Sequence, residues 1–229
     1  EHIHGGMAEY VVVPAHRLHA KPGRLSFVEA AAVPLVFQTA WRALVTRARV
    51  RPGESVCVLG GSGGVATAAI QIARLAGARV IAVTSSPERA ERVRALGADV
   101  VVDRTAESWS KAVWLATGKR GVDVVVENVG EATWRDSLRA AGRAGRIVTY
   151  GATTGPTPQT DIRLVFWKQL TILGSTMASD PEFDTVLRLV ADGSLQPVVG
   201  EVLPLADARL GHERLEAGQV FGKVVLQVA

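Results

Sequence analysis

The stretch Gly61-Ser62-Gly63-Gly64-Val65-Ala66 decides the fold, because it lies between the apolar run 55–59 and the Ala- and Ile-rich segment 66–76. That order predicts a strand, a tight glycine turn and a helix. We expect Gly61 to permit the turn, Gly63 to let the backbone approach a phosphate, and Ala66 to let the helix lie close to the strand. The helix N-terminus offers free N–H groups and a positive dipole end to a diphosphate. The motif therefore predicts dinucleotide binding, with a purely structural glycine turn as the alternative.

Beyond this motif, strand-like and helix-like segments alternate along the chain. We expect strands at about 55–60, 79–84, 99–102, 122–127, 145–150 and 170–174, and helices at about 63–76, 87–96, 105–117, 131–141 and 161–168. The run 80–83 is continuously apolar, which is typical of parallel strands covered on both faces. The pattern predicts an α/β fold, a doubly wound six-stranded parallel Rossmann sheet with right-handed crossovers.

The two flanks of this region follow a different rhythm. Residues 8–13 read as a strand that Pro14 ends, and Ser26 with Glu29 forms a capping box for a short helix that Pro34 closes, before a second helix at about 35–47. After residue 175 we expect a helix at 180–192, an extended stretch at 198–205, a helix at 206–217 and a strand at 223–226. We therefore predict a dinucleotide-binding domain over 48–178 and a second lobe built from 1–47 and 179–229.

Composition excludes several classes of protein. No apolar run approaches the about 20 residues that span a bilayer, and the first ten residues lack the apolar core of a signal peptide. The net charge of +4 comes from arginines scattered along expected helices, so we predict no nucleic-acid partner. The single cysteine, Cys57, excludes an internal disulfide and a cysteine-rich zinc site, and a cytoplasmic protein is expected.

Several further motifs occur in the order in which one protein family carries them. They are Gly6-Met7-Ala8-Glu9-Tyr10-Val11, Thr39-Ala40-Trp41, Leu96-Gly97-Ala98-Asp99, the segment 169–177, and Phe221-Gly222-Lys223-Val224-Val225-Leu226. Together with the glycine motif, they make the chain resemble the medium-chain dehydrogenase/reductase superfamily, in particular its zinc-type alcohol dehydrogenase and quinone-oxidoreductase-like members. The resemblance implies that 1–47 holds the end of a GroES-like catalytic domain and the inter-domain helices. It also implies that 179–229 returns to that domain, most of which is expected to lie upstream of this chain.

Cofactor choice depends on the end of the second expected strand. An NAD-preferring site usually carries an acid where Thr84 stands, because a carboxylate bonds the ribose hydroxyls and repels a 2′-phosphate. Ser85 and Ser86 offer hydroxyl groups and Arg89 offers a cation instead. We therefore expect NADP(H), with NAD(H) as the alternative. Ser86 also has a competing role, as the cap of the helix that begins at Pro87.

The resemblance implies further cofactor contacts. The diphosphate is expected on the turn formed by Gly61, Ser62, Gly63, Gly64 and Val65, with Val65 also near the nicotinamide. Thr39 and three loops at the carboxyl ends of strands are expected around the nicotinamide: Asn128-Val129-Gly130, Gly151-Ala152-Thr153 and Ser175-Thr176-Met177. Lys223 matches a family position near the cofactor phosphates, and an exposed edge-strand lysine is its alternative reading.

Catalysis and metal binding are less defined. Family members that use catalytic zinc carry a cysteine where this chain has Leu35, so the resemblance implies an incomplete catalytic zinc site, and Thr39 is only a weak catalytic candidate. His2 and His4 on one strand face, or His16 and His19 across a turn, complete no known metal-ligand spacing, so we predict no metal site. His212, on a polar helix, is expected to be solvated.

The sequence therefore predicts an oxidoreductase that transfers a hydride between NADP(H) or NAD(H) and a small alcohol, carbonyl, quinone or activated alkene. The alternative is a nicotinamide-nucleotide-binding module or sensor without turnover. The family commonly dimerises by joining sheet edges, so a homodimer through the expected strand 170–174 is a further prediction. A small-molecule substrate is expected, and neither a nucleic acid nor a membrane.

Overall fold

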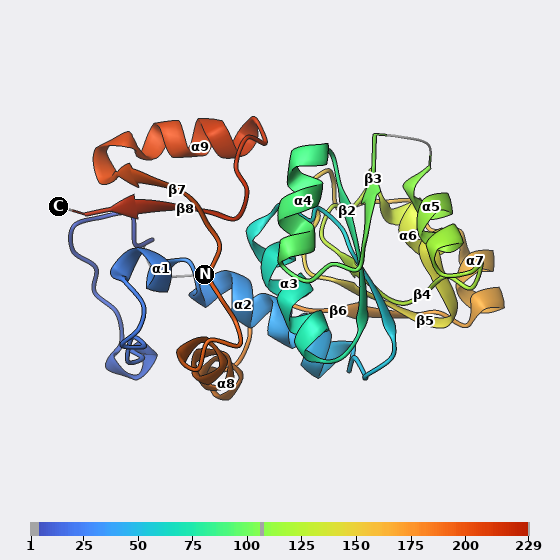
Figure 1. Ribbon diagram of the computed structural model, residues 1–229, viewed down its shortest axis with the longest axis horizontal. Helices are drawn as coiled ribbons and strands as arrows, with labels where there is room; N and C mark the ends of the chain where they lie inside the picture. Colours follow the sequence, from blue (N-terminus) through green and yellow to red (C-terminus); the bar gives the residue numbers. More distant parts are fainter. Residues whose placement is uncertain (1–4, 106–107, 229) are drawn as a thin grey trace.

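The computed structural model describes residues 5–105 and 108–228, and these form two sheets (Figure 1). The larger sheet has six parallel strands in the order β3-β2-β1-β4-β5-β6. Its strands are β1 (Ser55–Val58), β2 (Arg79–Thr84), β3 (Val100–Asp103), β4 (Val122–Glu127), β5 (Ala141–Thr149) and β6 (Thr171–Gly174). This order is the dinucleotide-binding topology, and it confirms the predicted Rossmann fold.

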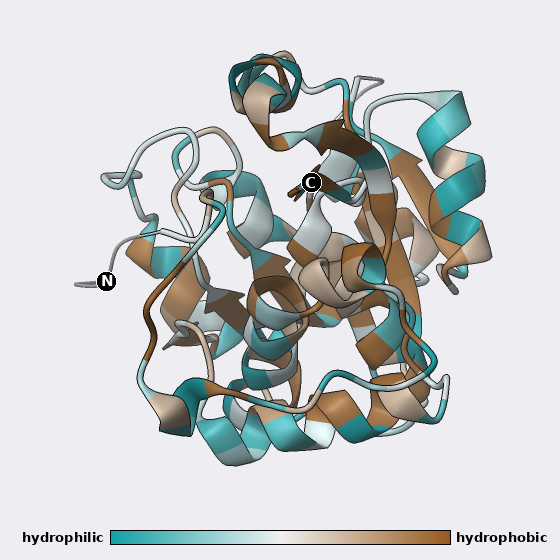
Figure 2. Ribbon diagram, turned by 90° about the vertical axis from the view of Figure 1, so that its left-hand side faces the viewer, coloured by the Kyte–Doolittle hydropathy of each residue, from teal (hydrophilic) through white to brown (hydrophobic). Residues whose placement is uncertain are grey.

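Helices cover both faces of this sheet, because successive residues of each strand point to opposite sides. On β1, Val56 and Val58 belong to one hydrophobic cluster, whereas Cys57 and Leu59 belong to the other. The first cluster, which we call the α3 face, includes residues of α2 (Pro34–Trp41), α3 (Gly64–Leu75), α4 (Pro87–Ala95) and α8 (Asp180–Ala191). The opposite face is covered by α5 (Trp109–Ala116), α6 (Trp134–Ala140) and α7 (Ile162–Lys168). Figure 2 shows the hydrophobic colour concentrated on the strands between these layers.

A second, smaller sheet lies beside the first (Figure 1). It pairs β7 (Val199–Pro204) with β8 (Lys223–Gln227) in parallel, and the two strands are joined through the short η3 (Leu205–Asp207) and α9 (Ala208–Glu216). The short helices η1 (Ala15–Arg17) and α1 (Phe27–Ala31) lie on the same side of the molecule. A bridge between Gly63 and Gly222 joins this part to the start of α3. The domain limits proposed from the sequence remain a prediction.

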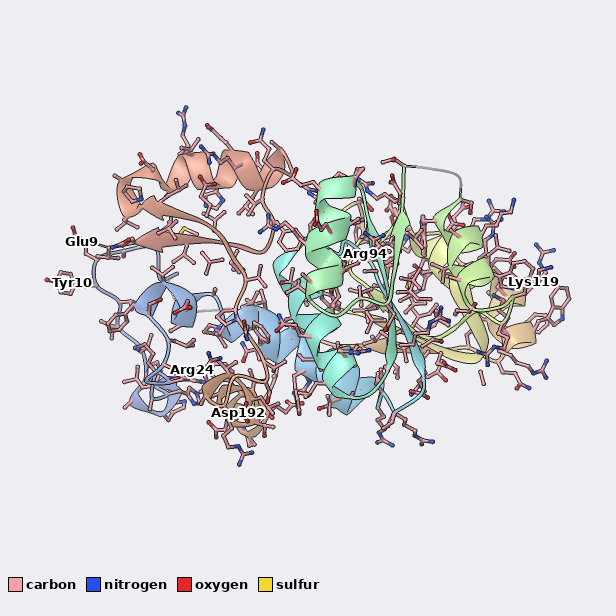
Figure 3. All side chains as sticks on the ribbon, in the orientation of Figure 1. Glu9, Tyr10, Arg24, Arg94, Lys119 and Asp192 are labelled. Carbon is pink, nitrogen blue, oxygen red and sulfur yellow. The ribbon has the colours of Figure 1, made fainter. Side chains whose placement is uncertain are left out.

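One expected strand is wrong. Residues 8–13 form no strand, and Tyr10 and Val12 are 91% and 92% exposed. Figure 3 shows Glu9 and Tyr10 at the outer end of the molecule. A segment of residues that favour strands forms one only where a neighbour completes the hydrogen bonds, and the described residues provide no neighbour there.

Helix boundaries differ from expectation in three places. The helix expected at 105–117 begins at Trp109, and residues 106–107 lie outside the described residues. The capping box of Ser26 and Glu29 is present, but Pro34 occupies the first turn of α2 rather than ending α1. α2 also continues as a π-helix, η2 (Arg42–Arg47), in which Ala48 N donates to Ala43 O at 2.9 Å. Within the described residues, no helix combines the length and apolarity needed to cross a membrane.

Candidate functional site

The glycine turn after β1 is built differently from the sequence-based expectation. The residue with left-handed backbone is Gly60, at φ +62°, and Gly63 N donates to Gly60 O at 2.8 Å to close the turn. Gly61 is buried and its N–H donates to Val83 O at 2.9 Å, while a Cβ on Gly61 would lie 3.4 Å from that oxygen. Gly60 therefore supplies the conformational freedom, and Gly61 supplies close contact with β2. The prediction that Gly61 permits the turn is therefore wrong, because Gly60 has the positive φ angle.

The start of α3 is open to an anion. Its N-cap is Gly63, which has no side chain to accept hydrogen bonds from the first turn. The N–H groups at a helix start have no partner within the helix, and the helix dipole is positive there. A diphosphate is the kind of ligand that such a start binds well.

A cavity of about 340 Å³ lies between this turn and the smaller sheet. Five of the predicted cofactor residues line it: Gly63, Gly64, Val65, Asn128 and Lys223. The remaining lining residues are Met7, Leu35, Val36, Gly60, Ala66, Ala208, Gly211, His212, Leu215, Gly222, Val224 and Leu226. Thr39 is buried on α2, at 6% exposure, and does not line this cavity.

Lys223 lies across the start of α3. A Cβ on residue 64 would be only 2.8 Å from Lys223 Cδ and 3.0 Å from Val36 Cγ1, so the close approach depends on Gly64. Lys223 is partly buried and has no carboxylate partner among the described residues. The lysine is therefore a cleft residue rather than a freely exposed edge lysine. His212 is exposed as expected, but it shares the cavity wall with Leu215.

At the end of β2, the guanidinium of Arg89 lies beside the hydroxyl group of Ser85. Arg89 Nη1 donates to Ser85 Oγ at 3.4 Å, and Arg89 Nη2 donates to the Gly218 carbonyl. Ser86 Oγ accepts from Arg89 N at 3.3 Å, so Ser86 does cap α4. Asp103, the register partner of Thr84, accepts hydrogen bonds from Thr105 N and Oγ1 at 2.8 and 2.7 Å.

Four buried side-chain atoms within the described part of the chain have no hydrogen-bond partner: Thr84 Oγ1, Asn128 Oδ1, Tyr150 Oη and Ser175 Oγ. Thr84 is the last residue of β2, and the other three directly follow β4, β5 and β6, so all four lie at the carboxyl edge of the sheet. Buried polar groups are nearly always paired, and an unpaired one is costly. These four atoms, which we call the unpaired row, therefore indicate a polar ligand at this edge.

The unpaired row also lies on one face of the sheet. Ala82, Val126, Val148 and Leu173 each stand two residues before a member of the row, and each packs in the cluster of the α3 face. Residues two apart on a strand share a face, so the row points to the side where α3 begins. A nicotinamide dinucleotide is polar along its length, and this row with the glycine turn fits such a group. Thr84, Asn128 and Ser175 were predicted cofactor residues, whereas Tyr150 was not.

The remaining predicted loops are tied together beside this row. Thr153 N donates to Asn128 O at 3.2 Å, and Ser175 N donates to Thr149 O at 2.9 Å. Arg47, at the end of η2, adds a bond from Nε to Gly174 O at 2.8 Å. The loop residues Val129, Gly151, Ala152, Thr176 and Met177 therefore lie at this edge without lining the cavity, and Ser62 contributes its carbonyl to Gly222 N at 2.8 Å.

The most buried charged group among the described residues is Glu127, the last residue of β4, which was not a predicted site residue. Its carboxylate is 0% exposed and accepts from Val129 N at 2.7 Å, Gly130 N at 3.1 Å, Thr133 Oγ1 at 2.9 Å and Ser137 Oγ. These bonds hold the loop that begins with Asn128. An acid that follows three consecutive valines at a strand end is the signal that could have revealed it. Burial, and then the nearby Glu127, raises the pKa of Cys57, so this thiol stays protonated.

The histidines do not assemble a metal site among the residues described. His2 and His4 lie outside the described residues, and His19 Nδ1 pairs with Asp184 Oδ1 at 3.1 Å. No group of three or more His, Cys, Asp or Glu side chains in ranges 5–105 and 108–228 is placed to hold a metal ion. Leu35 lines the cavity and is 51% exposed.

The chain is similar to a known family of dehydrogenases and reductases. Residues 64–192 match the family model described as zinc-binding dehydrogenase. Crotonyl-CoA reductase of Streptomyces avermitilis is 34% identical over 94% of this chain, but the chain spans only 54% of that protein. The human quinone oxidoreductase is 31% identical over 98% of this chain, which spans 70% of it.

Solved structures agree with these matches. A crystal structure of an NAD-dependent alcohol dehydrogenase is 49% identical with a TM-score of 0.96, covering 100% of this chain and 67% of its own. The 2-octenoyl-CoA carboxylase reductase CinF, in complex with NADP and 2-octenoyl-CoA, is 35% identical with a TM-score of 0.91, covering 97% of this chain and 54% of its own.

Proposed function

This chain belongs to the zinc-binding dehydrogenase family, and from that premise we propose that it serves hydride transfer between a nicotinamide dinucleotide and a small substrate. The proposed substrate classes are an alcohol, a carbonyl, a quinone or an activated alkene. The observation that carries the proposal is the unpaired row on the same side of the sheet as the glycine turn, because it supplies polar atoms at the carboxyl ends of four of the six strands.

The proposed cofactor position follows the strands. The start of α3 and Lys223 hold the diphosphate, since both present positive charge to the same cavity. Ser85 and Arg89 hold the phosphate of an NADP(H) adenosine, because no acid stands at Thr84 to repel it. NAD(H) is the competing cofactor: CinF was solved with NADP, whereas the more similar alcohol dehydrogenase is NAD-dependent.

The proposed chemistry divides between cofactor and protein. When bound, the dinucleotide gives or takes the hydride at its nicotinamide ring, and the protein fixes that ring against the substrate in a cleft that excludes water. Thr39, buried on α2, is the candidate from this chain for a hydroxyl near the reacting atoms. Leu35 has no donor atom for zinc, so we propose that this position holds no metal ligand and that any metal would need donors from elsewhere.

The proposed assembly is a homodimer through β6. This strand is an edge of the six-stranded sheet, and large apolar side chains surround it on β6 and α7. Ile162, Phe166, Trp167 and Ile172 are 70%, 55%, 66% and 41% exposed. Unpaired edge strands with apolar neighbours favour association with a second copy. Light scattering tests this: a dimer that Trp167→Asp turns into a monomer supports the proposal, and an unchanged dimer contradicts it.

The functional proposal is tested by titration with NADPH and NADH, followed by absorbance assays with quinones, aldehydes and enoyl thioesters. Binding of either nucleotide and its substrate-dependent oxidation is the expected result. Binding without oxidation across the panel would favour a non-catalytic nucleotide sensor, and no binding at all would refute the proposal. The lone buried Cys57 also leads us to propose a cytoplasmic site of action.

A further inference from the structure

Tyr150 stands at the carboxyl edge, one strand in from the β6 end of the six-stranded sheet. It follows β5, and the neighbouring strands β4 and β6 are followed by Asn128 and Ser175. Tyr150 N donates to Glu127 O at 3.1 Å, which continues the strand pairing past β5. Its ring packs against the cluster of the α3 face, so its side chain projects to the side where the glycine turn lies. The phenol therefore lies between the other two unpaired atoms of this half of the row.

The phenol oxygen has no partner within the described residues. Tyr150 Oη is inaccessible to solvent and makes no hydrogen bond, although the side chain as a whole is partly exposed. The nearby Glu127 carboxylate does not serve it, because that carboxylate accepts from Val129, Gly130, Thr133 and Ser137. Hydroxyls of buried tyrosines usually find a partner, so this one points to a partner that comes from outside the chain.

The order of the strands says which part of a dinucleotide would reach Tyr150. Arg89 and Ser85, after β2, mark the adenosine end, and the turn after β1 marks the diphosphate. Strands are about 4.8 Å apart, so β5, two strands beyond β1, lies about 10 Å from the diphosphate position. A ribosyl-nicotinamide group spans such a distance. This step rests on the proposed function.

We propose that the Tyr150 hydroxyl donates a hydrogen bond to the carboxamide oxygen of the nicotinamide and so positions the ring. The phenol and the group are complementary, because a protonated tyrosine hydroxyl donates one hydrogen bond and the oxygen of a primary carboxamide accepts one. Burial, and then the nearby Glu127 carboxylate, raises the pKa of Tyr150, which keeps the phenol protonated as a donor.

The test compares two ligands and two variants. NADPH carries the carboxamide, whereas 2′-phospho-ADP-ribose lacks the nicotinamide but keeps the adenosine and diphosphate ends. The variant Tyr150→Phe removes one oxygen and keeps the ring. The chain has two tyrosines, and Tyr10→Phe is the matched control because Tyr10 is 91% exposed at the far end of the molecule (Figure 3).

We expect Tyr150→Phe to weaken NADPH binding about 3- to 10-fold and to leave 2′-phospho-ADP-ribose binding unchanged. Tyr10→Phe should alter neither, and thermal unfolding of Tyr150→Phe should occur at the same or a higher temperature. Unchanged NADPH affinity, or equal weakening of both ligands, would overturn the role of Tyr150 while leaving the proposed function standing. If the wild-type protein binds NADH in place of NADPH, the same comparison is made with NADH and ADP-ribose, and failure to bind any of the four ligands would overturn both proposals.

Discussion

Glu127 and Asn128 are consecutive residues that differ in the hydrogen bonding of their side chains. Glu127 faces α6 and its buried carboxylate accepts hydrogen bonds from four residues. Asn128 faces the side where α3 begins, and its buried Oδ1 has no partner. One step along the chain thus separates a polar group that the fold satisfies completely from one that it leaves unpaired.

This difference separates structural from ligand-binding polarity at the same sheet edge. A satisfied buried group contributes to folding, so its loss should lower stability and leave the intrinsic affinity of the folded site little changed. An unpaired buried group costs stability, so its loss should be neutral or stabilising in the free protein and harmful only when the ligand is present. Each prediction below tests one side of this contrast.

The largest effect is expected at Glu127. Glu127→Ala removes the carboxylate that accepts from four donors, two of them buried and two partly buried, and we expect the free energy of unfolding to fall by about 3 kcal/mol. Urea-induced unfolding measures the loss, and Glu127→Gln, which keeps one acceptor oxygen, should lose less. A change below about 0.5 kcal/mol would show that the carboxylate contributes little to stability, and it would contradict the distinction drawn between Glu127 and Asn128.

The next effect is expected at Arg89, whose guanidinium lies beside Ser85. Arg89→Ala should weaken binding of NADPH by about 1–3 kcal/mol, because a charged hydrogen bond to the 2′-phosphate is lost, while NADH binding changes less. Fluorescence titration with both nucleotides measures the difference. Arg94→Ala, on the exposed surface of α4 (Figure 3), is the matched control. Equal losses for NADPH and NADH would remove Arg89 from cofactor selection.

A smaller effect should follow from two isosteric or nearly isosteric changes in the unpaired row. Thr84→Val and Ser175→Ala each remove a buried hydroxyl that has no partner, so unfolding free energy should stay the same or rise slightly. Nucleotide affinity should fall by about 0.5–1 kcal/mol for each, measured by calorimetric titration. Loss of stability without loss of affinity would mean that these hydroxyls are structural.

The smallest effect concerns Glu182, a satisfied but less buried carboxylate. Burial opposes its ionisation, but hydrogen bonds from Ser179 N, Thr46 and Ser179 Oγ, together with the nearby Arg42, outweigh burial and lower the pKa of Glu182. A carboxylate with a lower pKa in the folded state stabilises the protein above its unfolded pKa of about 4.3 and loses that contribution as pH falls through the folded pKa.

Glu182→Gln should therefore cost about 1 kcal/mol near pH 7 and progressively less below about pH 4. Chemical unfolding of both proteins at pH 7, 5 and 3.5 measures the gap. A difference in stability that widens on acidification would mean that folding raises the pKa of Glu182 instead of lowering it. Glu182 would then not be a carboxylate that hydrogen bonds stabilise in its charged form.

Local pattern was enough to predict most of the framework. The strand–turn–helix around Gly63, the capping box of Ser26 and Glu29, and the cap at Ser86 depend on residues within a few positions of one another, so their sequence carries the information. The strand expected at 8–13 was wrong because strand pairing depends on a neighbouring strand, which the residues of the segment itself do not determine. The sequence also did not predict which glycine has a positive φ angle, because Gly60 and Gly61 are chemically identical.

The polar contents of the site were harder to predict, for a physical reason. Thr84, Asn128 and Ser175 could be expected from the family resemblance, but nothing in the sequence distinguishes a paired hydroxyl from an unpaired one. Glu127 ends β4 and Tyr150 directly follows β5, and only their three-dimensional surroundings show that the Glu127 carboxylate is hydrogen-bonded whereas the Tyr150 hydroxyl has no partner among the described residues.

The bond from Gly222 N to Ser62 O, with the Gly63–Gly222 bridge, fixes the small sheet to the glycine turn itself. A rotation of the small sheet about this joint would keep Lys223 over the proposed diphosphate position while His212 and Leu215, on α9, move across the cavity. The glycine turn proposed to hold the diphosphate would then lie on the axis of this rotation. The cofactor would stay bound while the cavity opens and closes to substrate.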